Sequence, residues 1–268
     1  MQINSKSSGR KYTNMTIYIF GNWKMNLTAD ESVSLAANIQ EQTNTIPEID
    51  VCISVFPALP NIYPVYDAIN GGNILIGAQN IHTEISGSFT GETSVAMLDG
   101  VCAYLLVGHS ERRALFQESN ANINSKIALA IDFNIRPVLC VGELDYEDNP
   151  GVSPDSILTS QLNEALHGLP ASKITEILFA YEPLSAIGTG TPMSPELVDR
   201  KLKFIKETVA FKSGSTIASK DVAVMYGGSV TPDNATSYLE LKSVDGLLVG
   251  GASLVADSFI EICHLAGN

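Results

Sequence analysis

The sequence predicts a single α/β domain folded as a (β/α)₈ barrel with eight parallel strands. From Thr16 onward, short apolar runs alternate with longer segments of helical periodicity. Runs such as Tyr104-Leu105-Leu106-Val107 are apolar throughout, which is typical of parallel strands whose outer face is covered by helices. The strand-and-helix unit recurs eight times with no linker rich in serine or glycine. This count favours a closed barrel over an open sheet.

The strand candidates are residues 17–22, 50–56, 73–78, 102–109, 135–141, 176–182, 221–226 and 245–250. We expect helices between them. Segment 28–42 opens on Thr28 with Glu31 three residues later, which is the pattern of a capping box. Ser194-Pro195 and Thr231-Pro232 each place a hydroxyl before a proline, which is a helix-start signal.

The alternative fold, an open dinucleotide-binding sheet, would need G-x-G-x-x-G after the first strand. The sequence there is Gly21-Asn22-Trp23-Lys24-Met25-Asn26, so that fingerprint is absent. Residues 1–14 are polar and lack the apolar core of a secretory signal. We therefore expect a disordered extension over 1–14 and a catalytic barrel domain over 15–268.

Composition restricts the partners. Hydrophobic residues make up 45% of the chain and charged residues 17%, which is enough apolar material for a large core. The net charge of −13 predicts repulsion from nucleic acid and from anionic membranes. No apolar run reaches the roughly 18 residues that a transmembrane helix needs. Any site for an anion must be locally positive.

The cysteines indicate a reducing compartment. Cys52, Cys102, Cys140 and Cys263 are widely spaced, form no C-x-x-C pair, and in three cases lie in predicted strands. We expect buried, reduced thiols and a cytoplasmic protein. No cluster of histidine, cysteine and carboxylate has metal-ligand spacing, so we expect neither a metal nor an organic cofactor, and no effect of EDTA.

Candidate catalytic residues stand where predicted strands end, which is where barrel enzymes place their active sites. A lysine, a histidine and a glutamate would supply a cation, a hydrogen-bond donor and a base for proton abstraction beside a carbonyl. Paired glycines and a serine would expose backbone N–H groups to a phosphate. The residues are Asn22, Lys24, His109, Glu182, Gly227-Gly228-Ser229 and Gly250-Gly251.

Each of these residues taken alone has a simpler interpretation. His109 could cap a helix, Glu182 could be a helix-start carboxylate, Lys24 could be a solvated charge, and each glycine pair could form a turn. Their occurrence together at the ends of five different strands favours the functional interpretation.

The chain resembles the triosephosphate isomerase family along nearly its whole length. The motifs that carry the resemblance occur in the family's order: Gly21-Asn22-Trp23-Lys24-Met25-Asn26, Gly77-Ala78-Gln79-Asn80, Thr90-Gly91-Glu92, Gly108-His109-Ser110-Glu111-Arg112-Arg113, Tyr181-Glu182-Pro183, Ala186-Ile187-Gly188-Thr189-Gly190, Tyr226-Gly227-Gly228-Ser229 and Leu248-Val249-Gly250-Gly251-Ala252.

The resemblance implies a TIM barrel that interconverts dihydroxyacetone phosphate and D-glyceraldehyde 3-phosphate in glycolysis and gluconeogenesis. It implies that Glu182 moves the proton between two carbons through an enediolate. His109 and Lys24 would polarise the substrate oxygens, with Asn22 assisting.

The resemblance also implies how the ligand and a partner chain are bound. The phosphate would be held by Gly188, Ser229, Gly250 and Gly251. The lid would include Pro183, Leu184, Ser185, Ala186, Ile187, Thr189 and Gly190. A dimer loop from Gln79 would carry Thr90 to the partner's site, so a homodimer is implied.

The lid departs from the family pattern, because Ser185 stands where the family usually has tryptophan and Thr191-Pro192-Met193 replaces a hinge that usually contains lysine. We expect a less well supported closed lid. Two alternatives remain: a catalytically weak barrel kept for phosphate binding or interaction, and another phosphosugar isomerase on the same barrel.

Overall fold

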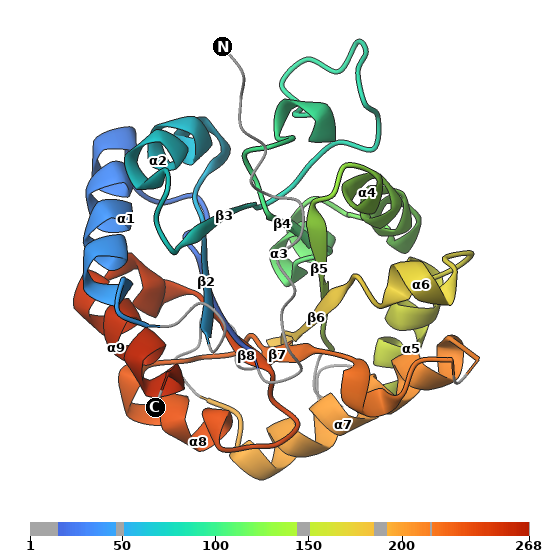
Figure 1. Ribbon diagram of the computed structural model, residues 1–268. Coiled ribbons are helices and arrows are strands. Elements are labelled where there is room, and N and C mark those ends of the chain that lie inside the picture. Colours follow the sequence, from blue (N-terminus) through green and yellow to red (C-terminus); the bar gives the residue numbers. More distant parts are fainter. Residues whose placement is uncertain (1–15, 47–50, 144–150, 185–191, 215, 268) are drawn as a thin grey trace.

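The computed structural model describes residues 16–46, 51–143, 151–184, 192–214 and 216–267. Within them, parallel strands close into one barrel in chain order, with the last strand paired to the first (Figure 1). The predicted (β/α)₈ barrel is confirmed. The strands are β1 Ile17–Asn22, β2 Val51–Phe56, β3 Leu75–Ala78, β4 Tyr104–Val107, β5 Arg136–Val141, β6 Leu178–Tyr181, β7 Val224–Tyr226 and β8 Gly246–Val249.

Most of the helices surround the barrel on the outer side of its strands (Figure 1). The α-helices are α1 Ala29–Thr43, α2 Ile62–Ile69, α3 Ser110–Leu115, α4 Asn120–Asp132, α5 Pro154–Ala165, α6 Ala171–Ile174, α7 Pro195–Lys212, α8 Pro232–Leu239 and α9 Ala256–Ala266. Short 3₁₀ turns are η1 Leu59–Asn61, η2 Val95–Met97, η4 Ser219–Asp221 and η5 Gly251–Leu254.

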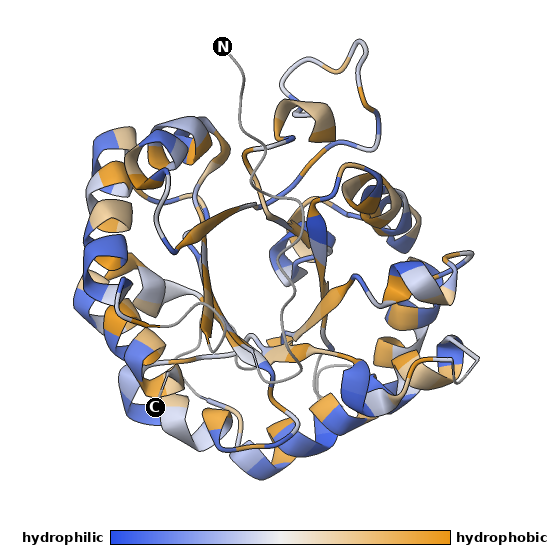
Figure 2. Cartoon of the chain, viewed as in Figure 1, coloured by the Kyte–Doolittle hydropathy of each residue, from blue (hydrophilic) through white to orange (hydrophobic). Residues whose placement is uncertain are grey.

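The core has two layers, because each strand buries both of its faces. In β1, Tyr18 and Phe20 belong to the cluster inside the barrel, whereas Ile19 belongs to the cluster between strands and helices. In β5, Cys140 points inward and Val141 outward in the same alternation. This double burial explains why the strands read as continuous apolar runs, and Figure 2 shows the apolar colour on the strands and on the inner sides of the helices.

Several predicted strands were too long. Strand β4 ends at Val107 because Gly108 takes a left-handed backbone conformation (φ +72°), so His109 lies outside the strand and caps α3. The predicted strand 221–226 begins instead with a 3₁₀ turn that ends at Asp221. Residues 73–74, 102–103, 135, 176–177, 182, 222–223, 245 and 250 also lie outside the strands. The sequence stays apolar and rich in strand-forming residues beyond the point where hydrogen bonding between the strands stops.

The helix-start signals are confirmed. Thr28 and Glu31 form the capping box of α1, and the Ser194 side chain accepts the Leu197 N–H at the start of α7. Thr231 caps α8 in a box with Asn234. Side chains therefore satisfy N–H groups that a helix start leaves without partners.

Two other expectations, on the cysteines and on membrane spans, can be compared with the fold, and a third cannot. All four cysteines are free and buried, although Cys102 precedes β4 and is not part of it. None of the described helices combines the length and apolarity needed to cross a membrane. The expected extension over residues 1–14 lies outside the described residues.

Candidate active site

The candidate catalytic residues converge at the C-terminal ends of the strands. Asn22 ends β1, His109 follows β4 after one glycine, and Glu182 directly follows β6. A Cβ atom placed on Gly227 would lie 3.1 Å from Glu182 Cγ, and one placed on Gly250 would lie 3.9 Å from Lys24 Cε. Residues from β1, β4, β6, β7 and β8 thus meet at one rim of the barrel, as the strand-end argument predicted.

The turn that carries Lys24 is unusual and well fixed. Lys24 has φ +52°, a left-handed conformation that non-glycine residues rarely adopt. Its backbone N–H donates to Asn22 Oδ1 at 3.0 Å, and its carbonyl accepts from Gln79 Nε2 at 2.8 Å. The same Gln79 nitrogen also donates to the Phe56 carbonyl. The side chains of Asn22 and Gln79 therefore fix the backbone of Lys24 on both sides.

The Lys24 ammonium pairs with Glu111. Its Nζ donates to Glu111 Oε1 at 2.7 Å, and both side chains remain partly exposed to solvent. An arriving anion would share this ammonium with Glu111 across partly solvated space. The pairing therefore fixes the position of the cation without burying it.

His109 is held as a neutral hydrogen-bond donor. Its Nδ1 accepts the Glu111 N–H at 3.2 Å, so that nitrogen carries a lone pair and the ring proton lies on Nε2. Nε2 lies 3.1 Å from Glu182 Oε1. The start of α3, where backbone N–H groups are free, thus selects the tautomer that points a proton into the site.

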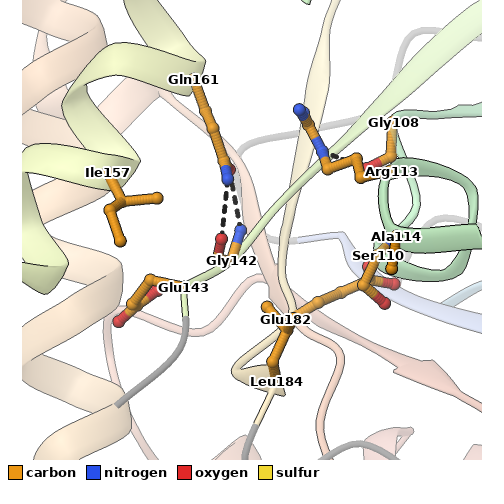
Figure 3. Close-up of a pocket in the computed structure, with 10 residues that line it drawn as sticks. All are labelled: Gly108, Ser110, Arg113, Ala114, Gly142, Glu143, Ile157, Gln161, Glu182 and Leu184. Atoms are coloured by element: carbon orange, nitrogen blue, oxygen red, sulfur yellow. Dashed lines mark hydrogen bonds between the residues drawn. The ribbon is translucent and has the colours of Figure 1, made fainter. Parts of the chain in front are cut away.

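Glu182 is buried and fully engaged. Its side chain is 3% exposed, Oε2 accepts the Ser110 N–H at 2.9 Å, and Oε1 faces His109. Its backbone N–H donates to the Val141 carbonyl at 2.8 Å, which anchors it to β5. Figure 3 shows the side chain reaching toward Ser110. The carboxylate is positioned by the first N–H group of α3 and by an imidazole.

The approach of β5 to β6 at this point depends on Gly142. A Cβ atom there would lie 1.9 Å from the Glu182 carbonyl oxygen, so a side chain cannot be accommodated without displacing the base. Cys140 lies beside the same carboxylate. Burial, together with the negative charge of Glu182, raises the pKa of the Cys140 thiol well above its ordinary value. The thiol stays protonated and is neither a nucleophile nor a metal ligand.

The predicted phosphate site is described in part. Ser229 is half-buried after β7, and Gly250 and Gly251 form the start of η5 after β8. A Cβ atom on Gly251 would meet nothing within 4 Å, so the backbone there borders open space. Gly188 and the lid residues Ser185, Ala186, Ile187, Thr189 and Gly190 lie outside the described residues. Pro183 and Leu184 are described, and the Leu184 N–H donates to the Glu143 carbonyl.

Sequence reasoning missed two contributors to the site. The Ser110 N–H holds the proposed base and Glu111 pairs with the proposed cation, although only His109 in that motif was given a role. The signal was available, because the residues after His109 begin a helix, and free N–H groups at a helix start bind carboxylates. Within the described residues, no group of three or more histidine, cysteine or carboxylate side chains is arranged for a metal.

The site combines a buried carboxylate, a neutral imidazole N–H and a partly exposed ammonium at the rim of a (β/α)₈ barrel. This combination is typical of enzymes that isomerise phosphorylated carbonyl compounds by proton transfer. The fold and site thus define the class as a barrel isomerase that acts by acid–base chemistry.

Comparison with known proteins identifies the family. The family model for triosephosphate isomerase matches residues 17–266. The triosephosphate isomerase of Chlorobium phaeobacteroides is 40% identical over 250 residues, covering 93% of this chain and 98% of the relative. That of Caldanaerobacter subterraneus subsp. tengcongensis is 40% identical over 247 residues, with 92% and 98% covered.

A solved structure agrees. The crystal structure of triosephosphate isomerase from Bartonella henselae superposes with a TM-score of 0.80 at 32% identity, covering 93% of this chain and 98% of that one. The chain belongs to the triosephosphate isomerase family and is an isomerase.

Proposed function

We propose that this enzyme interconverts dihydroxyacetone phosphate and D-glyceraldehyde 3-phosphate with Glu182 as the base. The observation that carries the proposal is the contact between Glu182 Oε1 and His109 Nε2, 3.1 Å apart in a buried site. A carboxylate and an imidazole donor side by side can act on the adjacent C–H and C=O groups of one substrate. One pair of side chains can therefore act on both the carbon that loses the proton and the carbonyl oxygen beside it.

His109 and Glu182 are hydrogen-bond partners of each other. A substrate carbonyl that accepts the Nε2 proton of His109 would replace Glu182 Oε1 as its partner. Glu182 would then be free to turn from the Ser110 N–H toward the substrate carbon. The carboxylate would take a proton from one carbon, and an enediolate would form. The hydroxyl proton would pass to the former carbonyl oxygen by way of His109 Nε2, and Glu182 would return its proton to the neighbouring carbon. A neutral histidine that polarises the substrate carbonyl is the known arrangement in this family.

The anionic part of the substrate would lie between Lys24, Ser229 and the glycines after β8. Lys24 Cε lies close to Gly250, so the ammonium and the backbone N–H groups there can face one ligand. In a chain with a net charge of −13, this local positive potential is what an anionic substrate needs. Asn22 would assist by holding the Lys24 turn. We include Gly188 and the lid in this phosphate site on the basis of the family resemblance alone.

We further propose a cytoplasmic homodimer. The segment between β3 and η2 projects away from the barrel (Figure 1), and Ile85 and Phe89 in it are 48% and 42% exposed. Met25, beside Lys24, is 93% exposed. Exposed apolar side chains next to a catalytic loop favour burial by a partner, whose Thr90 would approach Asn22 and Lys24. Four buried, free cysteines support a reducing compartment.

A coupled assay that follows dihydroxyacetone phosphate formed from D-glyceraldehyde 3-phosphate tests the proposal. We expect saturable turnover by the wild-type enzyme. Phosphate binding without turnover would instead support a barrel kept for binding. Turnover of a larger phosphosugar in preference to the triose would support another isomerase on the same fold.

A further inference from the structure

Arg113 makes three directed hydrogen bonds beside the active site but touches none of the groups assigned to the reaction. From α3, its Nε donates to the Gly108 carbonyl at 2.6 Å and its Nη2 donates to the Cys140 carbonyl at 3.1 Å. Its Nη1 donates to Asn120 Oδ1 at 2.6 Å. The guanidinium is therefore fixed on three sides, and two of its partners are backbone carbonyls. Figure 3 shows Arg113 beside Gly108.

Those two carbonyls belong to the segments that carry the proposed acid and base. Gly108 is the left-handed residue directly before His109. Cys140 lies in β5, and the next residue, Val141, accepts the Glu182 backbone N–H. The planar fork of Arg113 thus bridges the β4 end to the strand against which Glu182 is anchored. A change in this bridge would alter the separation of His109 and Glu182.

The guanidinium of Arg113 is partly removed from water and lies near negative charges. Burial lowers the pKa of Arg113, and the nearby negative charges of Glu118, Glu182 and Glu164 oppose this only in part. Arg113 is half-buried, and packing alone would be served as well by an apolar side chain. A lysine could not reproduce the two-carbonyl fork, because its ammonium is a single point donor.

We propose that Arg113 is a positioning residue that sets the His109–Glu182 geometry by tying the carbonyl before His109 to strand β5. This inference rests on the roles proposed above for His109 and Glu182. Since Arg113 does not contact the substrate, its loss should lower kcat and leave KM nearly unchanged.

A cavity beside the guanidinium makes chemical rescue feasible. A space of about 260 Å³ is lined by Arg113, Gly108, Ser110, Gly142 and Glu182, among others (Figure 3). In Arg113→Ala this space would extend into the volume that the side chain leaves. A free guanidinium ion could then enter and occupy the same carbonyl-lined position.

The test compares Arg113→Met with Arg136→Met. Arg136 is a matched control, since it also donates to a backbone carbonyl, that of Glu176, and to Tyr18 Oη, but at the opposite end of β5. We expect Arg113→Met to lose about 10- to 100-fold in kcat through misplaced catalytic groups, while Arg136→Met keeps the wild-type value. Guanidinium chloride at non-denaturing concentration should raise the kcat of Arg113→Ala several-fold and leave Arg136→Met unaffected.

Equal kcat values for Arg113→Met and Arg136→Met would overturn the proposal, as would a loss that appears in KM or no response to guanidinium. If the methionine and alanine variants do not fold, Arg113→Lys decides, because it keeps the charge but not the fork. Wild-type kcat in Arg113→Lys would then refute the positioning role. Glu182→Gln is assayed alongside: its full activity would refute the role proposed for Glu182, and absence of wild-type turnover would refute the proposed function, whatever the Arg113 variants show.

Discussion

Lys24 combines a strained backbone with a proposed catalytic role. A left-handed conformation at a non-glycine residue costs on the order of 1–3 kcal/mol, and such strain persists only where neighbouring groups enforce it. Here the Asn22 and Gln79 side chains bond the Lys24 N–H and carbonyl. The strain therefore marks a position at which the direction of the side chain matters more than local stability.

Removing the Lys24 charge should affect both binding and turnover. We expect Lys24→Ala to raise KM and lower kcat, each by about 10- to 100-fold, because a charge-assisted hydrogen bond to an anionic substrate is lost. Lys203→Ala is the matched control, since Lys203 pairs with Asp199 on the exposed side of α7. Steady-state kinetics with D-glyceraldehyde 3-phosphate check this. An unchanged KM in Lys24→Ala would show that the anion is held without the lysine.

Glu143 gives a pH signature that is separate from catalysis. Burial raises the pKa of Glu143 above its ordinary 4.5, and the hydrogen bond and charge of Lys201 oppose this only in part. The folded state then holds more protons than the unfolded state just above pH 4.5, so stability contributed by this group falls as pH rises. Glu143→Gln lacks the titration. The wild type should therefore lose stability relative to Glu143→Gln as pH increases from 4.5.

Urea unfolding at several pH values measures this difference. Glu164→Gln is an opposite-sign control, because hydrogen bonds from Ser160 and Asn120 lower the pKa of Glu164. For that group, stability is present above the ordinary pKa and is lost as pH falls. Parallel pH curves for wild type and Glu143→Gln would contradict the assignment.

At the level of elements, the sequence predicts helix starts better than strand ends. The capping hydroxyls of Thr28, Ser194 and Thr231 act locally, so a few adjacent residues suffice to identify them. The end of β4 depends instead on Gly108 turning left-handed and on pairing with β5. A strand end is a tertiary property, and apolar residues beyond it look the same in sequence.

The same distinction explains the site. His109 and Glu182 could be predicted because strand ends meet at one rim. The helix start after His109 indicates that a carboxylate binds there, but not that it is Glu182 that the Ser110 N–H contacts. The contacts of Arg113 could not be predicted, because they depend on α3 lying within hydrogen-bond distance of β5. Sequence order fixes which strand ends converge, but not which groups of neighbouring units touch.

Loss of one cap should weaken α1 and leave catalysis intact. Thr28 accepts the Glu31 N–H, and Glu31 accepts the Thr28 N–H at 2.8 Å. We expect Thr28→Ala to lower the free energy of unfolding by about 1 kcal/mol. Ser125→Ala removes a mid-helix hydroxyl that bonds only the Ala121 carbonyl, and should change stability by less than about 0.5 kcal/mol. Equal urea midpoints for both variants would contradict the capping role.

The loop that projects from the barrel between β3 and η2 allows the proposed homodimer to be tested. Light scattering after size exclusion should give twice the chain mass of 28.6 kDa for the wild type. Thr90→Arg places charge and bulk at the proposed interface, so we expect monomers with reduced kcat. Phe211→Asp alters another exposed apolar residue, 83% exposed on α7, and should leave the mass unchanged. A monomeric, fully active wild type would refute the dimer.

In the proposed reaction, Glu182 carries the proton between two carbons of the substrate. The most direct measurement is conversion of D-glyceraldehyde 3-phosphate in D₂O, followed by proton NMR, for wild type and Glu182→Gln. We predict deuterium at C1 of part of the dihydroxyacetone phosphate formed by the wild type, and a loss of about 10²-fold or more in kcat for Glu182→Gln, because an amide accepts no proton. Product free of deuterium would indicate transfer without exchange, as in a hydride shift. Retention of more than about a tenth of wild-type turnover by Glu182→Gln would contradict its role as the base.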